Sequence, residues 1–309
     1  MGVASASEPN TSWTDPLVGI GLRVAAGGHV PARWFLPRLP ATAPKPPPGR
    51  PLRLEIVTHC WRYAPFLTHQ LNSLVRFPPG ALELTVSVYH AASDPDTVRV
   101  LESFAGRPPK GVRWNWRTLP EPSLFRRAIG RNEAALRTDA DWVWFTDCDV
   151  LFRENCLDEL AGALRGRTEH LLFPNRERVT PLLASDHLLL SAEFARPFGP
   201  DVDPALFEEE EVRRATGPLQ IVHGDTARAC GYCGSLSYYQ KPVRRWAKAY
   251  EDRALRWLLR TPGTPVDVPG VHRIRHQSKG RYNGRWSSRI RQACRRLQGT
   301  QRWDDSRRG

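Results

Sequence analysis

Apolar and polar positions follow two alternating periods over the first half of the chain. Some stretches are continuously apolar or alternate with a period of two, which is typical of strands, and others repeat at helical spacing. The pattern predicts strands over 52–58, 82–89, 112–116 and 142–146, and helices over 63–77, 94–104, 124–136 and 155–164. Strands that alternate with helices in this way predict an α/β fold with a mostly parallel central sheet and helices on both faces.

Beyond residue 164 the pattern becomes irregular. Its predicted elements are strands over 171–174, 188–191 and 265–268, an exposed helix start at the acidic run 208–211, and one helix over 242–260.

Proline and charge divide the chain into three parts. Seven prolines between residues 37 and 51 predict a stiff, extended linker. We therefore expect an N-terminal arm and linker over 1–51, a main domain over 52–285, and a basic tail with an amphipathic helix over 286–309.

The net charge of +13 is concentrated near the C-terminus. Residues 273–309 hold twelve Lys or Arg and two Asp, a balance of +10, which leaves +3 for the other 272 residues. A nucleic-acid groove would spread its charge over the domain. The tail instead favours an anionic membrane surface or nonspecific polyanions, with no specific nucleic acid as partner.

The sequence also bears on location. It shows neither a run of about 20 apolar residues nor a secretory signal at its start. Six cysteines in a long chain of this kind favour a reducing compartment. We expect a cytoplasmic protein, peripheral at the inner face of the membrane if the tail binds lipid. Cys230 and Cys233 have the spacing of half a zinc site, with His223 as a weak third ligand, but a structural role is favoured.

An apolar, Trp-rich stretch over 142–146 ends abruptly in Asp147-Cys148-Asp149. Extended chain has a side-chain period of two, so the two carboxylates can point the same way. At the carboxyl end of a buried strand, such a pair suits a divalent cation and the diphosphate that it carries. The alternative is an acidic turn after a strand.

Asp147-Cys148-Asp149 is one of five segments that stand in a recognisable order. The other four are Ile56-Val57-Thr58-His59-Cys60, Ser93-Asp94-Pro95-Asp96-Thr97, Gly130-Arg131-Asn132-Glu133-Ala134, and Tyr250-Glu251-Asp252-Arg253-Ala254-Leu255-Arg256 with the later His276. With these segments the chain resembles inverting glycosyltransferases of the GT-A fold, especially family 2, over residues 52–285. The resemblance implies a Rossmann-related GT-A-like sheet, with the irregular half after residue 164 on the acceptor side, and an enzyme that uses a nucleotide sugar.

The resemblance also implies roles for single residues. Mn²⁺ or Mg²⁺ would be held by Asp147, Asp149 and His276. The donor, most simply a UDP-sugar, would contact Thr58, His59, Asp94, Arg131 and Asp147, and the base that deprotonates the acceptor hydroxyl would be Asp252, with Glu251 second.

Several alternatives stay open. Asp252 and Arg256 have the spacing of a helical ion pair, and the Gly-rich approach usual before the Glu-Asp pair is missing. Arg131 could pair with Glu133 or Asp139. His90 or Ala91 occupies the position where the family often places an aspartate near uracil. Asp94 and Asp96 lie farther on and could either substitute for it or simply cap the next helix. The fallback bases are Asp225, Asp201 and Asp203.

Two other functions compete with glycosyl transfer. A nucleotidyltransferase-like enzyme also binds nucleotides on an α/β sheet, but it should carry a Gly-rich basic loop after the first strand, and residues 58–62 do not form one. The other competitor is a non-catalytic, basic polyanion-binding or nucleic-acid-binding protein.

Overall fold

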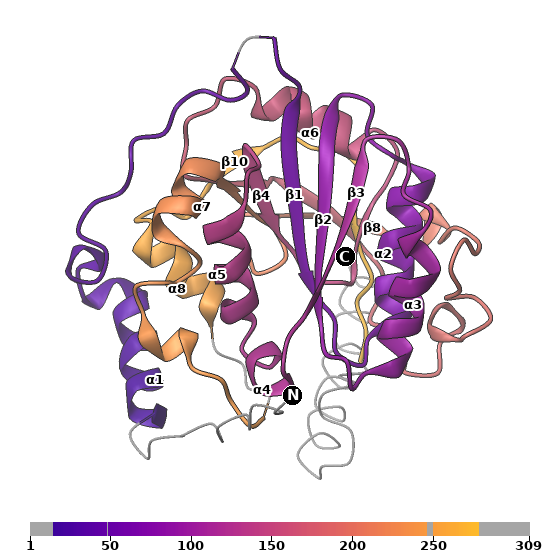
Figure 1. Cartoon of the computed structure of the whole chain (residues 1–309), viewed down its shortest axis with the longest axis horizontal. Helices are drawn as coiled ribbons and strands as arrows, with labels where there is room; N and C mark the ends of the chain where they lie inside the picture. The colour runs from indigo at the N-terminus through magenta and orange to yellow at the C-terminus, as the bar shows by residue number, and fades with distance from the viewer. Residues whose placement is uncertain (1–14, 48, 246–249, 278–309) are drawn as a thin grey trace, which may run out of the picture.

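The computed structural model describes residues 15–47, 49–245 and 250–277. Its centre is a seven-stranded sheet that is parallel except for one strand, β9, which runs antiparallel to both neighbours (Figure 1). The strand order is β10 (Thr264–Val266), β6 (Leu171–Pro174), β9 (Gln220–His223), β4 (Trp142–Phe145), β1 (Leu52–His59), β2 (Leu82–His90) and β3 (Val112–Thr118). The predicted α/β fold with a mostly parallel sheet is confirmed.

Helices cover both faces of this sheet. α5 (Arg127–Arg137), α7 (Gly224–Cys230) and α8 (Glu251–Leu258) lie on one side, and α2 (Ala64–Arg76) and α3 (Pro95–Ala105) on the other (Figure 1). Strands β1 and β4 are buried almost throughout, as expected for strands packed on both faces. Two further helices of the domain are α4 (Glu121–Leu124) and α6 (Cys156–Leu164).

A smaller, four-stranded sheet begins directly after the Asp-x-Asp segment. Its order is β5 (Val150–Phe152), β11 (Val271–Arg273), β7 (Arg176–Val179) and β8 (Glu208–Glu211). Since β4 belongs to the large sheet and β5 to the small one, residues 146–149 form the turn that connects the two.

The predicted helix start at 208–211 is wrong, because these glutamates form the exposed edge strand β8. In this conformation Glu209 lies 3.8 Å from Arg176 and 4.0 Å from Arg178 on the neighbouring strand. Glu210 lies 2.7 Å from Arg275. Pairing the acidic strand with arginines offsets a repulsion that four adjacent glutamates would otherwise face.

Other predicted elements also change. The 124–136 helix is split into α4 and α5, because Arg126 leaves the helical conformation (φ −105°, ψ 85°). The predicted strand at 188–191 is the 3-10 turn η3 (Leu188–Leu190). The predicted 242–260 helix begins only at Glu251, where Tyr250 takes a left-handed conformation (φ 57°), and residues 242–245 are irregular.

The N-terminal arm packs beside α8. It consists of α1 (Asp15–Val24), η1 (Ala25–His29) and η2 (Ala32–Trp34). The Trp257 indole of α8 donates to the Val30 carbonyl over 2.8 Å, and its ring lies 5.1 Å from that of Phe35. The linker then runs along the outside of the domain to β1 (Figure 1).

The predicted tail helix, 286–309, and the last eight residues of the predicted main domain lie outside the described residues. Among the helices that the structure does describe, none combines the length and the apolarity needed to cross a bilayer.

Candidate active site

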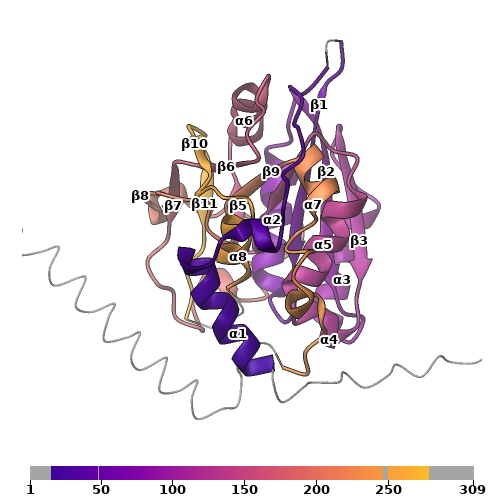
Figure 2. The same ribbon diagram turned by 90° about the vertical axis from the view of Figure 1, so that its left-hand side faces the viewer.

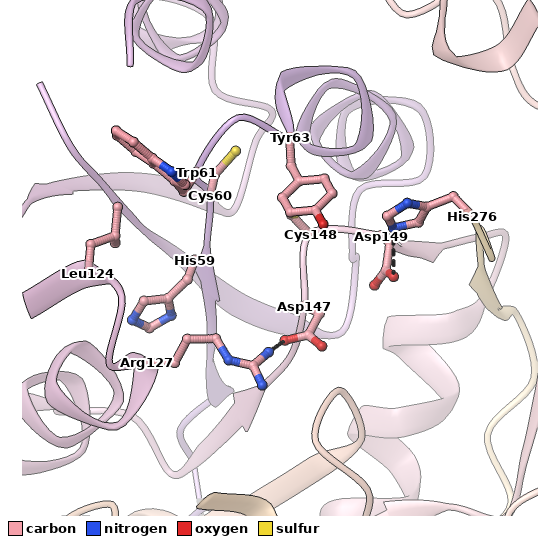
Figure 3. A pocket seen from close by; sticks show the side chains of 10 residues that line it. All are labelled: His59, Cys60, Trp61, Tyr63, Leu124, Arg127, Asp147, Cys148, Asp149 and His276. Atoms are coloured by element: carbon pink, nitrogen blue, oxygen red, sulfur yellow. Dashed lines mark hydrogen bonds and ion pairs between the residues drawn. The ribbon is translucent and has the colours of Figure 1, made fainter. Parts of the chain in front are cut away.

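The Asp-x-Asp turn opens into a pocket at the carboxyl end of β1 and β4. Asp147 and Asp149 both line it, so the two carboxylates share one concave site (Figure 3). They do so from a turn, and not from the extended conformation on which the expectation was based. The lining side chains come from segments far apart in the sequence: His59, Cys60, Trp61, Tyr63, Leu124, Arg127, Asp147, Cys148, Asp149 and His276.

Asp147 is held by two arginines of α5. Arg127 Nη1 forms a short ion pair with Asp147 Oδ1, and Arg131 Nη2 lies 3.2 Å from the same oxygen. The two arginines are four residues apart, so they project from the same face of the helix. Arg127 is a site residue that the sequence analysis missed, although this spacing from Arg131 was visible in the sequence.

Arg131 is fixed in the protein interior. Its side chain is 1% exposed, and it donates to the Thr146 carbonyl over 3.1 Å and to the Tyr232 hydroxyl over 2.8 Å. Among the described residues it forms no ion pair with Glu133 or Asp139, which bind other arginines instead. Arg131 therefore orients Asp147 rather than reaching into open solvent for a phosphate.

Asp149, directly before β5, faces His276, which follows the neighbouring strand β11. Asp149 Oδ2 lies 3.8 Å from His276 Nε2, and the imidazole is almost fully buried against the Phe66 ring, 4.0 Å away between centroids. Strand pairing explains the proximity, because the Ile274 amide donates to the Asp149 carbonyl over 2.9 Å. Residue 276 then follows two positions later, on the same side of the extended chain.

His59 contributes a neutral imidazole to the same pocket. Burial, together with the positive charges of Arg131 and Arg127, lowers the pKa of His59 well below its ordinary value. The ring stacks on Tyr89 at 5.0 Å, and neither ring nitrogen has a hydrogen-bond partner among the described residues. A Cβ at Gly130 would lie 2.3 Å from His59 Nε2, so the glycine makes room for this ring.

Two predicted donor residues lie beside the pocket rather than in its lining. Thr58 is fully buried on β1. Asp94 caps α3 by accepting from the Thr97 amide over 3.5 Å. It also accepts from the Thr97 hydroxyl over 2.7 Å and from the Arg62 amide over 2.6 Å. Asp94 therefore orders the loop after β1, which supplies Trp61 and Tyr63 to the pocket.

The Glu-Asp pair begins α8, behind Arg127. Glu251 is 5% exposed, and its Oε2 lies 4.0 Å from Arg127 Nε, so that arginine connects Glu251 with Asp147. Burial alone would lower the pKa of Arg127, yet the charges of Asp147 and Glu251 raise it above its ordinary value. Asp252 is one-third exposed and forms the helical ion pair with Arg256, at 3.2 Å. Neither acid lines the pocket as the structure stands.

The fallback bases lie elsewhere. Asp225 pairs with Arg228 at 2.6 Å, Asp201 with Arg153 at 2.8 Å, and Asp203 caps the short turn η4 (Pro204–Leu206). None of these three carboxylates lines the pocket.

The cysteines of the described chain are free thiols, including Cys230 and Cys233. His223 hydrogen-bonds the Ala43 carbonyl at 3.0 Å. Over residues 15–47, 49–245 and 250–277, no group of three or more His, Cys, Asp or Glu side chains is placed to hold a metal by itself.

With this geometry in place, comparison with known proteins decides the family. The model of glycosyl transferase family 2 matches residues 56–224, more than half of the chain. The chain belongs to glycosyl transferase family 2. The family match favours glycosyl transfer over the nucleotidyltransferase and over the non-catalytic polyanion binder. The match includes Asp147 and Asp149 and ends before Glu251, Asp252 and His276.

The chain is also similar, at low identity, to several solved structures. A mannosyltransferase, PcManGT from Pyrobaculum calidifontis in complex with GDP-Man and Mn²⁺, is 17% identical, with 94% of this chain and 76% of that chain covered and a TM-score of 0.45. TarS 1-349 of S. aureus in complex with UDP-GlcNAc is 14% identical, with 76% and 62% covered and a TM-score of 0.43. In the comparison with another structure of TarS 1-349, the protein described here spans 58% of the length of the TarS chain. The comparison with curated proteins gave no match.

Proposed function

We propose that this glycosyltransferase moves a sugar from a nucleotide-sugar donor to an acceptor hydroxyl, with inversion at the anomeric carbon and with Mn²⁺ or Mg²⁺. The observation that carries the proposal is the meeting of Asp147, Asp149 and His276 in one pocket at the end of β1 and β4. In open α/β sheets, ligands bind outside the carboxyl ends of the strands, where this pocket lies.

The donor set fits a divalent cation that is shared with its substrate. Asp149 offers a carboxylate and His276 an imidazole nitrogen, 3.8 Å apart. Mg²⁺ is usually held by one or two carboxylates and completed by water and substrate phosphates, so a full cage of protein ligands is not required. When bound, the cation would neutralise charge on the departing diphosphate as a Lewis acid.

The two acidic residues of the motif have different roles in this proposal. Asp149 with His276 would hold the cation. Asp147, whose charge is already compensated by Arg127 and Arg131, would face the ribose or the metal-bound water. His59, on the opposite side of Asp147 from Asp149, would contact the donor as part of the pocket wall.

Inversion requires a base on the face of the sugar opposite the diphosphate. Asp252 is the better candidate, because its partly exposed carboxylate can meet an acceptor hydroxyl, whereas Glu251 is buried beside Arg127. The Arg256 ion pair would have to loosen when the acceptor arrives. In this proposal Glu251 positions Arg127.

The test is a screen of UDP-sugars and GDP-sugars with Mn²⁺, with release of the nucleoside diphosphate as the readout. We expect one UDP-sugar to be consumed by the wild type. Asp252→Asn should retain donor affinity and lose transfer by about 100-fold or more. Equal rates of transfer by Asp252→Asn and the wild type would overturn the assignment of Asp252 as the base. If none of the nucleotide sugars were consumed, the proposed function would be overturned.

A further inference from the structure

The N-terminal helix α1 is apolar on two opposite faces. Its inner face holds Leu22, which is buried, and Gly19, where a Cβ would lie 2.5 Å from the Tyr238 hydroxyl. A surface helix that packs along one side normally carries polar residues on the other. In α1 the outer side is apolar as well, and the inner contacts do not account for it.

The outer face forms an apolar stripe of Leu17, Ile20 and Val24. These residues are 64%, 57% and 52% exposed, and their spacing places them on one side of the helix. Trp34, in the same arm, is 70% exposed. Figures 1 and 2 show α1 at the outer edge of the molecule, beside α8. Six of the ten large apolar side chains that are exposed among the described residues fall within residues 17–35.

The charge around this stripe is mainly positive, since the acidic residue of α1, Asp15, lies 3.5 Å from Lys241. From residue 16 to residue 54 the sequence holds six Arg or Lys and no Asp or Glu. Three of the six, Arg23, Arg33 and Arg38, are exposed and lie within or just after the apolar segment. None of the three is paired with a carboxylate among the described residues, and Arg23 lies over the Tyr250 ring at 4.1 Å.

We propose that α1 and Trp34 form a membrane-docking surface, with the apolar stripe in the interface of an anionic bilayer and the arginines at its headgroups. Helices that lie in the interface plane combine an apolar face with Arg or Lys beside it, and tryptophan prefers that depth. A second copy of the chain would instead bring the same three arginines against each other. The surface is separate from the pocket, so it does not depend on the proposed donor chemistry.

The test uses the full chain, because the basic tail adds its own attraction to anionic lipid. Binding is measured by co-sedimentation with phosphatidylglycerol-containing vesicles and with phosphatidylcholine vesicles. The variant is Leu17→Ser/Ile20→Ser/Val24→Ser, and the matched control is Leu188→Ser, which changes an equally exposed leucine (61%) on the distant turn η3. Circular dichroism verifies that both variants are folded.

We expect the wild type and the control to bind anionic vesicles, and the triple variant to bind about tenfold more weakly. Bromine-labelled acyl chains should quench wild-type tryptophan fluorescence more than that of Trp34→Phe. Equal binding by the triple variant and the wild type would overturn the proposal. The proposal would also be overturned if the wild type did not bind anionic vesicles. It would likewise be overturned if the wild type formed a dimer that the triple variant cannot form.

Discussion

His276 Nε2 lies 3.8 Å from Asp149 Oδ2, although 127 residues separate the two in the sequence. Pairing of β11 with β5 brings the end of the described chain back to the Asp-x-Asp turn. The small sheet therefore completes a site that begins on the large one. This relationship makes His276 the second protein ligand in the proposed cation site.

Replacement of His276 by glutamine should weaken binding of the cation and leave the fold intact. We expect Mn²⁺ affinity in the presence of UDP to fall by about 10- to 100-fold, the range seen when groups that support a metal site are removed. Titration followed by the electron paramagnetic resonance of free Mn²⁺ measures it. His272→Gln is the control, because this histidine of β11 is buried beside Phe207 and lies outside the pocket lining. Identical Mn²⁺ binding in His276→Gln and the wild type would remove His276 from the site.

Gly130 should be intolerant of alanine because of His59. An added Cβ would lie 2.3 Å from His59 Nε2 and 2.9 Å from Tyr89 Cδ1. We expect Gly130→Ala to lower the free energy of unfolding by about 1–3 kcal/mol, the usual cost of overpacking, and to weaken donor binding. Gly162→Ala on α6, where no atom lies within 4 Å of the new Cβ, should instead stabilise by about 0.5–1 kcal/mol. Urea denaturation compares the free energies of unfolding of the two variants. An unchanged free energy in Gly130→Ala would contradict the close packing of His59 against Gly130.

His59 should make the protein less stable in acid. Its pKa is lowered well below the ordinary value in the folded state, so the folded protein keeps it neutral, whereas the unfolded chain takes up a proton below about pH 6.5. Stability linked to this group is present above pH 6.5 and is lost as the pH falls, by up to about 1.4 kcal/mol per pH unit.

The difference between wild type and His59→Gln isolates this contribution from the other buried histidines. Free energies of unfolding measured from pH 7.5 to pH 5 should fall more steeply in the wild type. Parallel curves would show that His59 is protonated in the folded protein.

Arg131 should support the site by orienting Asp147 and not by contacting the substrate. Removing its buried guanidinium leaves the Thr146 carbonyl and the Tyr232 hydroxyl without their donor and Asp147 with a single arginine. We expect Arg131→Ala to cost about 3–5 kcal/mol of stability. Tyr232→Phe, which removes one neutral partner, should cost about 1 kcal/mol. Thermal and urea unfolding measure the loss of stability in both variants. Equal losses in Arg131→Ala and Tyr232→Phe would contradict the role of Arg131 as the residue that joins Asp147, Thr146 and Tyr232.

The sequence predicted the parts that depend on local pattern. The strands of the parallel core follow from apolar runs, and the pocket at Asp147 and Asp149 follows from their position at the carboxyl end of a buried strand. Arg127 was missed because a salt bridge from a helix to a turn 20 residues away depends on tertiary packing. The β8 strand and the left-handed Tyr250 were missed for the same reason, since the arginines opposite β8 and the contacts around α8 come from distant segments.

The most direct measurement is calorimetric titration of the donor with and without Mn²⁺. We expect the affinity of the wild type for the UDP-sugar to depend on Mn²⁺, and we expect Asp149→Ala to lose this dependence. The control is Asp139→Ala, which changes an exposed acid outside the pocket and should behave as the wild type does. Unchanged Mn²⁺-dependent affinity in Asp149→Ala would contradict a cation held at the Asp-x-Asp turn.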